Sequence, residues 1–134
     1  MALDGGCRCG AVRYTADVTK PEHHAICHCA DCRASSGAPM MAWLAVPEAS
    51  FRVTAGQATR YESSPGAERF FCNQCGTGLY YRNPDMLPGI IDIQSATLDA
   101  DTGQTPQAQI QCAERLDWVE RLDKLPAFDR YPGA

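Results

Sequence analysis

Residues 72–76 read Cys-Asn-Gln-Cys-Gly, and this stretch carries the most specific structural signal in the chain. Two cysteines separated by two residues are typical of a zinc knuckle, in which both thiolates bind one ion and the following glycine permits a tight turn. A structural zinc site needs four ligands, so one knuckle supplies only half of them. A second close pair, followed by Gly10, occurs near the start of the chain. The sequence therefore predicts a structural zinc site whose ligands are Cys7, Cys9, Cys72 and Cys75.

A further cysteine group, Cys27, Cys29 and Cys32, remains after that assignment. Three protein ligands and one open position describe a catalytic zinc site, because water or an incoming thiol can occupy the fourth position. The alternative is that this site is also closed, either by Cys112 or by a histidine. Cys112 stands alone in the sequence, which favours the role of an inert buried thiol.

The histidines near this group are interpreted as non-ligands. His28 lies between two predicted ligands, and on an extended segment its side chain would point away from them. His23 and His24 follow Pro21 and are interpreted as turn residues at the surface. A different partition, in which a cysteine of another group completes the triplet, would leave a mixed set of three cysteines and is ranked lower.

Metal-bound thiolates leave an excess of negative charge, so the arginines near the cysteines need an interpretation. Arg8 and Arg33 adjoin predicted ligands, and Arg69 lies on a predicted strand. The first interpretation is that each arginine is a surface charge or a partner of the thiolates. The alternative is that Arg33 or Arg69 receives a substrate carboxylate, because a guanidinium group matches the shape of a carboxylate. Arg33 is our candidate substrate contact.

The composition indicates one folded domain and limits the partners it can have. The chain has 134 residues, of which 45% are hydrophobic and 21% are charged, and its net charge is -4. Such a chain can bury a core, and its charge disfavours nucleic acid and acidic membrane surfaces as partners. We see no signal peptide and no apolar run long enough to cross a bilayer, so the expected location is the cytoplasm, where thiols stay reduced. Cysteines this close together also disfavour a disulfide framework.

Short apolar runs separated by turn residues predict a mainly β domain with little helix. A helix is expected only over residues 31–34, with a weaker candidate at 116–122 that could equally be extended. The domain is predicted to span residues 1–134, with 125–134 as a loosely packed tail. The expected strands cover residues 12–18, 40–46, 51–54, 59–62, 69–71, 79–82, 90–93 and 108–111.

The ordered motifs resemble the glutathione-dependent formaldehyde-activating enzyme family, which also contains the centromere protein V type domain. The resemblance implies a fold like that of Mss4, with twisted antiparallel sheets around zinc. It also implies the same division of zinc ligands that counting gave, four in the first site and three in the second. The residues that carry the resemblance are 5–14, 27–33, Gly37, Trp43, Phe51, Gly56, Tyr61, 71–77, 97–99, Trp118 and Pro126.

The resemblance implies an activity that joins glutathione to formaldehyde, as a carbon–sulfur lyase of the S-hydroxymethylglutathione synthase type. The partner would be a small thiol such as glutathione, and the catalytic site would be the zinc held by Cys27, Cys29 and Cys32. There is one departure, because family members often carry a histidine where this chain has Gln109, and glutamine cannot do acid–base chemistry. The competing hypothesis is a non-catalytic zinc-binding module with a structural or partner-binding role. A nucleic-acid or cytoskeletal role ranks third because the net charge disfavours it.

Overall fold

Two β-sheets make up the body of the molecule in the computed structural model, which describes residues 2–17, 19, 21–100 and 103–133. The smaller sheet has three antiparallel strands in the order β1-β2-β5. The larger has seven in the order β10-β3-β4-β9-β8-β7-β6, and all its pairs are antiparallel except β10 with β3. The strands are β1 (Ala2–Gly6), β2 (Arg13–Asp17), β3 (His23–Cys27), β4 (Met41–Pro47), β5 (Phe51–Ala55), β6 (Thr59–Ser64), β7 (Ala67–Phe71), β8 (Gly78–Arg82), β9 (Ile90–Gln94) and β10 (Ala108–Ile110).

The prediction of a mainly β fold is confirmed, and each expected strand has a counterpart in the two sheets. Two strands were missed, β1 and β3. The interpretation of His23 and His24 as turn residues is wrong, because both lie on β3. His23 is exposed as expected, but His24 has only 6% of its surface exposed and its Nε2 lies 2.8 Å from Ser95 Oγ. Val18, at the end of a predicted strand, and residues 1 and 134, the predicted domain ends, lie outside the described residues.

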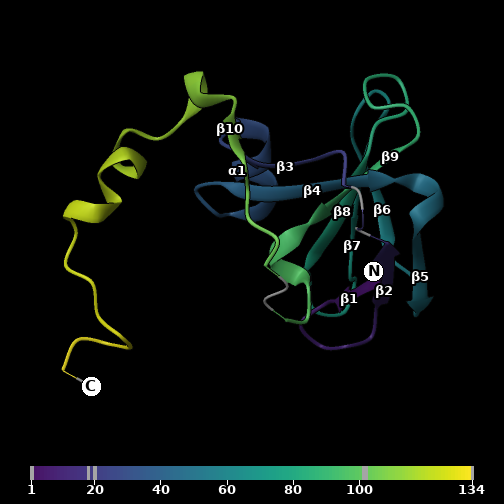
Figure 1. Ribbon diagram of the computed structural model, residues 1–134, viewed down its shortest axis with the longest axis horizontal. Coiled ribbons are helices and arrows are strands. Elements are labelled where there is room, and N and C mark those ends of the chain that lie inside the picture. Colours follow the sequence, from purple (N-terminus) through teal and green to yellow (C-terminus); the bar gives the residue numbers. More distant parts are fainter. Residues whose placement is uncertain (1, 18, 20, 101–102, 134) are drawn as a thin grey trace.

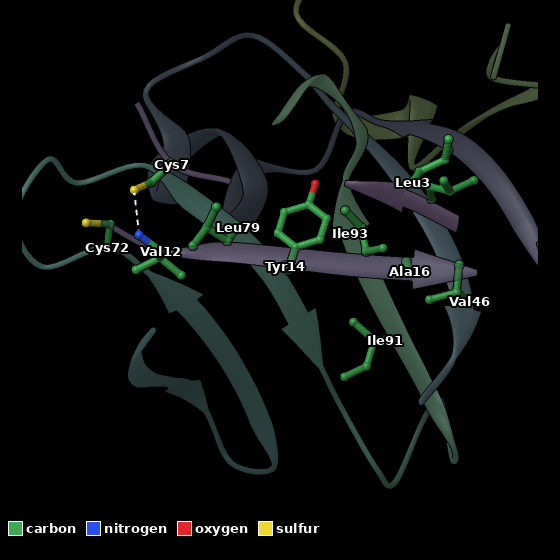
Figure 2. Close-up of a cluster of buried hydrophobic side chains, with 11 residues drawn as sticks. Leu3, Cys7, Val12, Tyr14, Ala16, Val46, Cys72, Leu79, Ile91 and Ile93 are labelled. Atoms are coloured by element: carbon green, nitrogen blue, oxygen red, sulfur yellow. Dashed lines mark hydrogen bonds between the residues drawn. The ribbon is translucent and has the colours of Figure 1, made fainter. Parts of the chain in front are cut away.

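The main core fills the space between the two sheets (Figure 2). Period-two alternation on β2 turns Tyr14 and Ala16 inward, and the facing side chains come from β4, β8 and β9. The Tyr14 hydroxyl lies 2.7 Å from Thr97 Oγ1, so its buried polar end has a partner. Cys7 and Cys72 sit at one end of this core, which couples the first cysteine group to the packing of both sheets.

The short helix α1 (Ala30–Ser36) lies close to β3, β4 and β10 (Figure 1). Cys29 is its N-cap, because the sulfur accepts a hydrogen bond from the N–H of Cys32 over 3.2 Å. Gly37 ends the helix with φ of 69°, a left-handed conformation that glycine adopts without strain. A second small cluster of buried side chains, Cys27, Cys32, Met41 and Trp43, forms beneath α1.

After β10 the chain leaves the sheets and forms an extended arm, which is yellow in Figure 1. The arm contains two 3-10 segments, Cys112–Glu114 and Asp117–Lys124, and the second includes the weak helix candidate at 116–122. All of residues 125–133 are exposed. None of the described residues forms a helix with the length and apolar character that a membrane crossing requires.

We predict that a chain ending at Lys124 folds as the full chain does. The removed side chains within the described range are exposed, so their loss forfeits little buried surface. The melting temperature, measured by circular dichroism, should change by less than about 2 °C, with unchanged metal content. A decrease of more than about 5 °C would show that residues 125–134 pack on the domain and would contradict the predicted loose tail.

Candidate metal centres and the adjoining cleft

Four cysteines from two distant parts of the chain meet at one end of the core. Cys7 and Cys9 follow β1, while Cys72 and Cys75 follow β7. Their four sulfur atoms all lie within 4.8 Å of one another. The Sγ–Sγ distance is 3.6 Å for Cys7 and Cys9 and 3.8 Å for Cys9 and Cys72, far beyond the S–S bond of about 2.05 Å in a disulfide. We call these four residues the first sulfur cluster.

Backbone N–H groups around the first sulfur cluster point at its sulfurs. The Val12 N–H donates to Cys7 Sγ over 3.2 Å (Figure 2). The Gln74 N–H donates to Cys72 Sγ over 3.4 Å. Gly10 and Gly76 each turn the chain with φ of 81°, as predicted from the presence of a glycine directly after each cysteine pair. These donors stabilise negatively charged sulfur, the form that binds a metal ion.

Thr77 links the two halves of the first sulfur cluster. Its Oγ1 accepts a hydrogen bond from the Arg8 N–H over 3.1 Å and lies 3.3 Å from Cys75 Sγ. Hydrogen bonds from the side chain and backbone of Thr77 lower the pKa of Cys75 to about 5. This shift favours the thiolate form of Cys75, which is the form that binds a cation.

The second sulfur cluster consists of Cys27, Cys29 and Cys32, whose sulfurs also lie within 4.8 Å of one another. Cys27 is the last residue of β3, and the other two lie at the start of α1. Cys32 Sγ is 3.7 Å from Cys27 Sγ. Burial raises the pKa of the Cys27 thiol to about 12, so the thiolate form needs a cation beside it. Within the described ranges, no fourth histidine, cysteine or carboxylate joins this group.

His28 and Cys112, two candidates for a fourth ligand, do not join the second cluster. His28 is fully buried, and its Nε2 lies 2.8 Å from Oε1 of Gln109 on β10. Gln109 therefore serves as the hydrogen-bond partner of this histidine. Cys112 is exposed, so its prediction as a buried thiol is wrong. The reason is local, because β10 ends at Ile110 and residues 111–114 lie outside the sheet with exposed surfaces.

Arg69 lies directly beside the second cluster. Its Nη2 donates to the Asp31 carboxylate over 2.8 Å and lies 3.9 Å from Cys32 Sγ. Its guanidinium carbon is 5.2 Å from the centre of the Tyr81 ring, within the range of a cation–π contact. Only 9% of the residue's surface is exposed. Arg69 thus places a fixed positive charge against the sulfurs, which fits its interpretation as a thiolate partner.

Arg33, the predicted substrate contact, lies on the side of α1 that faces the segment after β10. Its Nη2 donates to the backbone carbonyl of Glu114 over 3.2 Å. The Glu114 carboxylate in turn accepts a hydrogen bond from the Ala30 N–H over 3.0 Å. These two contacts hold residue 114 over the start of the helix, while a contact between Arg33 and a substrate stays a prediction.

Both clusters have donor sets that fit zinc. Four Zn–S bonds of about 2.3 Å in a tetrahedron place the sulfurs about 3.8 Å apart. The distances of 3.6, 3.8 and 3.7 Å quoted above are close to that value. Thiolate is also a donor type that selects zinc among common divalent ions. The seven predicted ligands thus lie in two groups that could each hold a metal ion.

A cleft with a volume of about 750 Å³ opens beside the second cluster. One wall comes from α1 and includes Asp31, and the large sheet contributes Trp43, Phe71 and Gln94. Arg69 also lines it, so a single side chain reaches both the cleft and Cys32 Sγ. Arg69 and Asp31 therefore connect the cleft to the second cluster, whose three cysteines do not themselves line it.

A sequence model described as "Glutathione-dependent formaldehyde-activating enzyme" matches residues 2–114. The matched span contains all seven cluster cysteines and the whole lining of the cleft. The chain belongs to this glutathione-dependent formaldehyde-activating enzyme family. Residue 1 and the segment after residue 114, which includes most of the arm, lie outside the match.

Individual relatives agree with membership of the formaldehyde-activating enzyme family. The chain is 30% identical over 129 residues to a Halomonas elongata protein named "Putative glutathione-dependent formaldehyde-activating enzyme", covering 90% of this chain and 81% of the relative. It is 34% identical over 106 residues to an uncharacterized lyase of Schizosaccharomyces pombe, covering 72% of this chain and 74% of the relative. A crystal structure of a Rhodobacter sphaeroides protein superposes with a TM-score of 0.62 at 25% identity, covering 78% of this chain and 98% of that one.

Sequence reasoning found the cysteines of this family member but missed the residues that shape its cleft. Gln94 is the last residue of a short, mostly apolar strand, which gives no local signal. Trp43 belongs to the residues that carry the family resemblance, but nothing in its local sequence points to a cleft. The pairing of β4 with β9 places these two side chains opposite each other, and that pairing cannot be read from either segment alone.

Proposed function

We propose that this protein is a metal-dependent carbon–sulfur lyase that acts on adducts of a small thiol with a small aldehyde, with glutathione and formaldehyde as the pair suggested by its family. The observation that carries the proposal is the three-cysteine cluster beside a cleft large enough for a substrate. The family match and the lyase named in Schizosaccharomyces pombe support the same reaction class.

The reaction is a reversible addition that needs no oxidant or reductant. The thiol sulfur attacks the carbonyl carbon, so a C–S bond forms and the π electrons of the C=O bond move to oxygen. The proton lost from the thiol ends on that oxygen, which gives a hemithioacetal. The reverse reaction breaks the C–S bond and returns the thiol and the aldehyde.

Zinc held by Cys27, Cys29 and Cys32 would lower the pKa of a bound thiol and keep its sulfur available as a nucleophile. The chain itself contributes the three ligands and leaves one position for the thiol. Arg69 opposes the charge that builds up when several sulfurs are negative together. The first cluster has four protein ligands and is assigned a structural role, because no position remains there for a substrate.

The proposal is tested by the exchange rate between free and adduct-bound formaldehyde in the presence of glutathione, measured by NMR exchange spectroscopy. The zinc-loaded full chain should accelerate exchange, and the acceleration should saturate with thiol concentration. Protein from which a chelator has removed the second-site metal should give only the uncatalysed rate. Unchanged exchange in a fully metal-loaded sample would contradict the proposal and favour the non-catalytic module.

A further inference from the structure

The floor of the cleft is one face of the large sheet. Trp43 pairs with Gln94 across β4 and β9, and Tyr61 pairs with Arg69 across β6 and β7. Arg69 also pairs with Tyr81 of β8, and Tyr81 pairs with Asp92 of β9. Paired residues point to the same face of a sheet, and so do residues two apart on one strand, such as Asp92 and Gln94. Arg69 and Gln94 therefore lie on the same face. The aromatic residues Trp43, Tyr61 and Phe71 belong to the lining. The cleft therefore offers apolar, flat surfaces next to the second cluster.

The charges that line the cleft compensate each other. Asp31 and Arg69 are the only charged side chains among the described residues of its lining, and they form an ion pair of 2.8 Å. Nη2 of Arg69 is engaged with that carboxylate and with Cys32 Sγ, whereas its Nε and Nη1 are buried without a hydrogen-bond partner. The lining therefore carries no net charge, so a ligand carboxylate that entered the cleft would compete with Asp31 for Arg69 and would lose its hydration.

The side chain of Gln94 gives the floor a polar group that can bind a ligand. The carboxamide of Gln94 lies over Gly78, where a β-carbon would approach its Nε2 to 2.4 Å. Gly78 pairs with Phe71 across a register shift in β7 and β8, so both residues border the same part of the cleft. The glycine thus leaves room for the amide, which can donate to or accept from a single ligand hydroxyl or carbonyl.

From these observations we propose that the cleft binds an uncharged aromatic group of the thiol–aldehyde adduct, with Gln94 bonding to the adduct's oxygen. This inference rests on the proposed function, because it names the substrate class of the same site. Glutathione carries two carboxylates and an ammonium group, and the lining offers no net positive charge to balance the two carboxylates. Formaldehyde alone would leave the cleft empty. The preferred adduct accordingly carries an aromatic ring, from the thiol or from the aldehyde.

Binding is tested first with probes that cannot react. Benzyl alcohol supplies an uncharged ring with one hydroxyl, and S-methylglutathione supplies the charged tripeptide without a free thiol. Each is titrated into the zinc-loaded full chain carrying Trp118→Phe, which leaves Trp43 in the cleft as the single tryptophan reporter. Benzyl alcohol should bind at least about tenfold more tightly than S-methylglutathione. Equal or tighter binding of S-methylglutathione, or no binding of benzyl alcohol, would overturn the proposal.

Two substitutions locate the bound ring. Gln94→Ala removes the amide, and Gly78→Ala displaces it, so each should weaken benzyl alcohol binding about 3- to 10-fold. Gln57→Ala, at an exposed position that does not line the cleft, is the matched control and should leave binding unchanged. Unaltered melting temperatures and metal content exclude a folding defect. Unchanged binding in both cleft variants would place benzyl alcohol elsewhere and overturn the proposal.

Exchange measurements then identify which half of the adduct carries the ring. Faster exchange for benzyl mercaptan with formaldehyde than for glutathione with formaldehyde assigns the ring to the thiol, and faster exchange for glutathione with benzaldehyde assigns it to the aldehyde. If glutathione with formaldehyde is accelerated most, the inference fails while the proposed function stands. If benzyl alcohol binds in the cleft but no pair is accelerated, the lyase function fails and the cleft assignment stands.

Discussion

Replacement of Cys72 by serine is expected to abolish cooperative folding of the chain. Cys72 is 1% exposed and packs in the main core, and its sulfur belongs to the cluster that joins the end of β1 to the end of β7. Zinc bound by four thiolates contributes about 10–16 kcal/mol in small zinc domains, whereas a whole domain is stable by only about 5–15 kcal/mol. Loss of one ligand should lower the melting temperature by more than about 15 °C or remove the transition.

The measurement combines thermal unfolding by circular dichroism with metal analysis by mass spectrometry. Cys112→Ser is the matched control, because it makes the same chemical change at an exposed cysteine outside both clusters. The control should shift the melting temperature by less than about 2 °C and retain all bound metal. A Cys72→Ser protein that melts like the control would show that the first cluster does not hold the fold together.

The spacing of the cysteines was enough to predict both clusters before any fold was known. Cysteines one or two residues apart, with Gly10 and Gly76 after two of the pairs, already define local turns that aim two sulfurs in one direction. The two pairs 7/9 and 72/75 supply the four ligands that close one site. The triplet of Cys27, Cys29 and Cys32 then remains for a second site. Because this reasoning uses only local geometry and ligand counting, it does not depend on the order of strands in the sheets.

The cleft could not be predicted because it depends on contacts between distant segments. Gln94 meets Trp43 only after β9 pairs with β4, and Arg69 meets Asp31 only after β7 approaches α1. The strand β3 was missed for a related reason. Its residues 23–27 begin with two histidines, which indicate a polar surface, yet its pairing with β4 and β10 buries His24. Tertiary context overrides local preference at both places.

Replacement of Cys29 by serine is expected to remove the second metal while leaving the fold intact. The sulfur of Cys29 caps α1 by accepting the N–H of Cys32, and serine is a strongly preferred N-cap that can accept the same hydrogen bond. The substitution therefore deletes a thiolate ligand but keeps the helix start. Metal content should fall from two ions per chain to one, the melting temperature should change by less than about 5 °C, and thiol–aldehyde exchange should slow by at least about 100-fold.

The comparison between the Cys29 and Cys72 variants separates the two hypotheses for the whole protein. An enzyme with one fold-closing site and one open site gives a folded, inactive Cys29→Ser protein and an unfolded Cys72→Ser protein. A non-catalytic module with two closed sites gives two variants that lose metal and structure together, because each ion then contributes its binding free energy to folding. Cys29 is only half-buried, and serine preserves its helix cap, so neither lost packing nor a lost cap would unfold the Cys29→Ser protein. If this variant nevertheless unfolds as Cys72→Ser does, the second metal holds the fold together and the open site has no support.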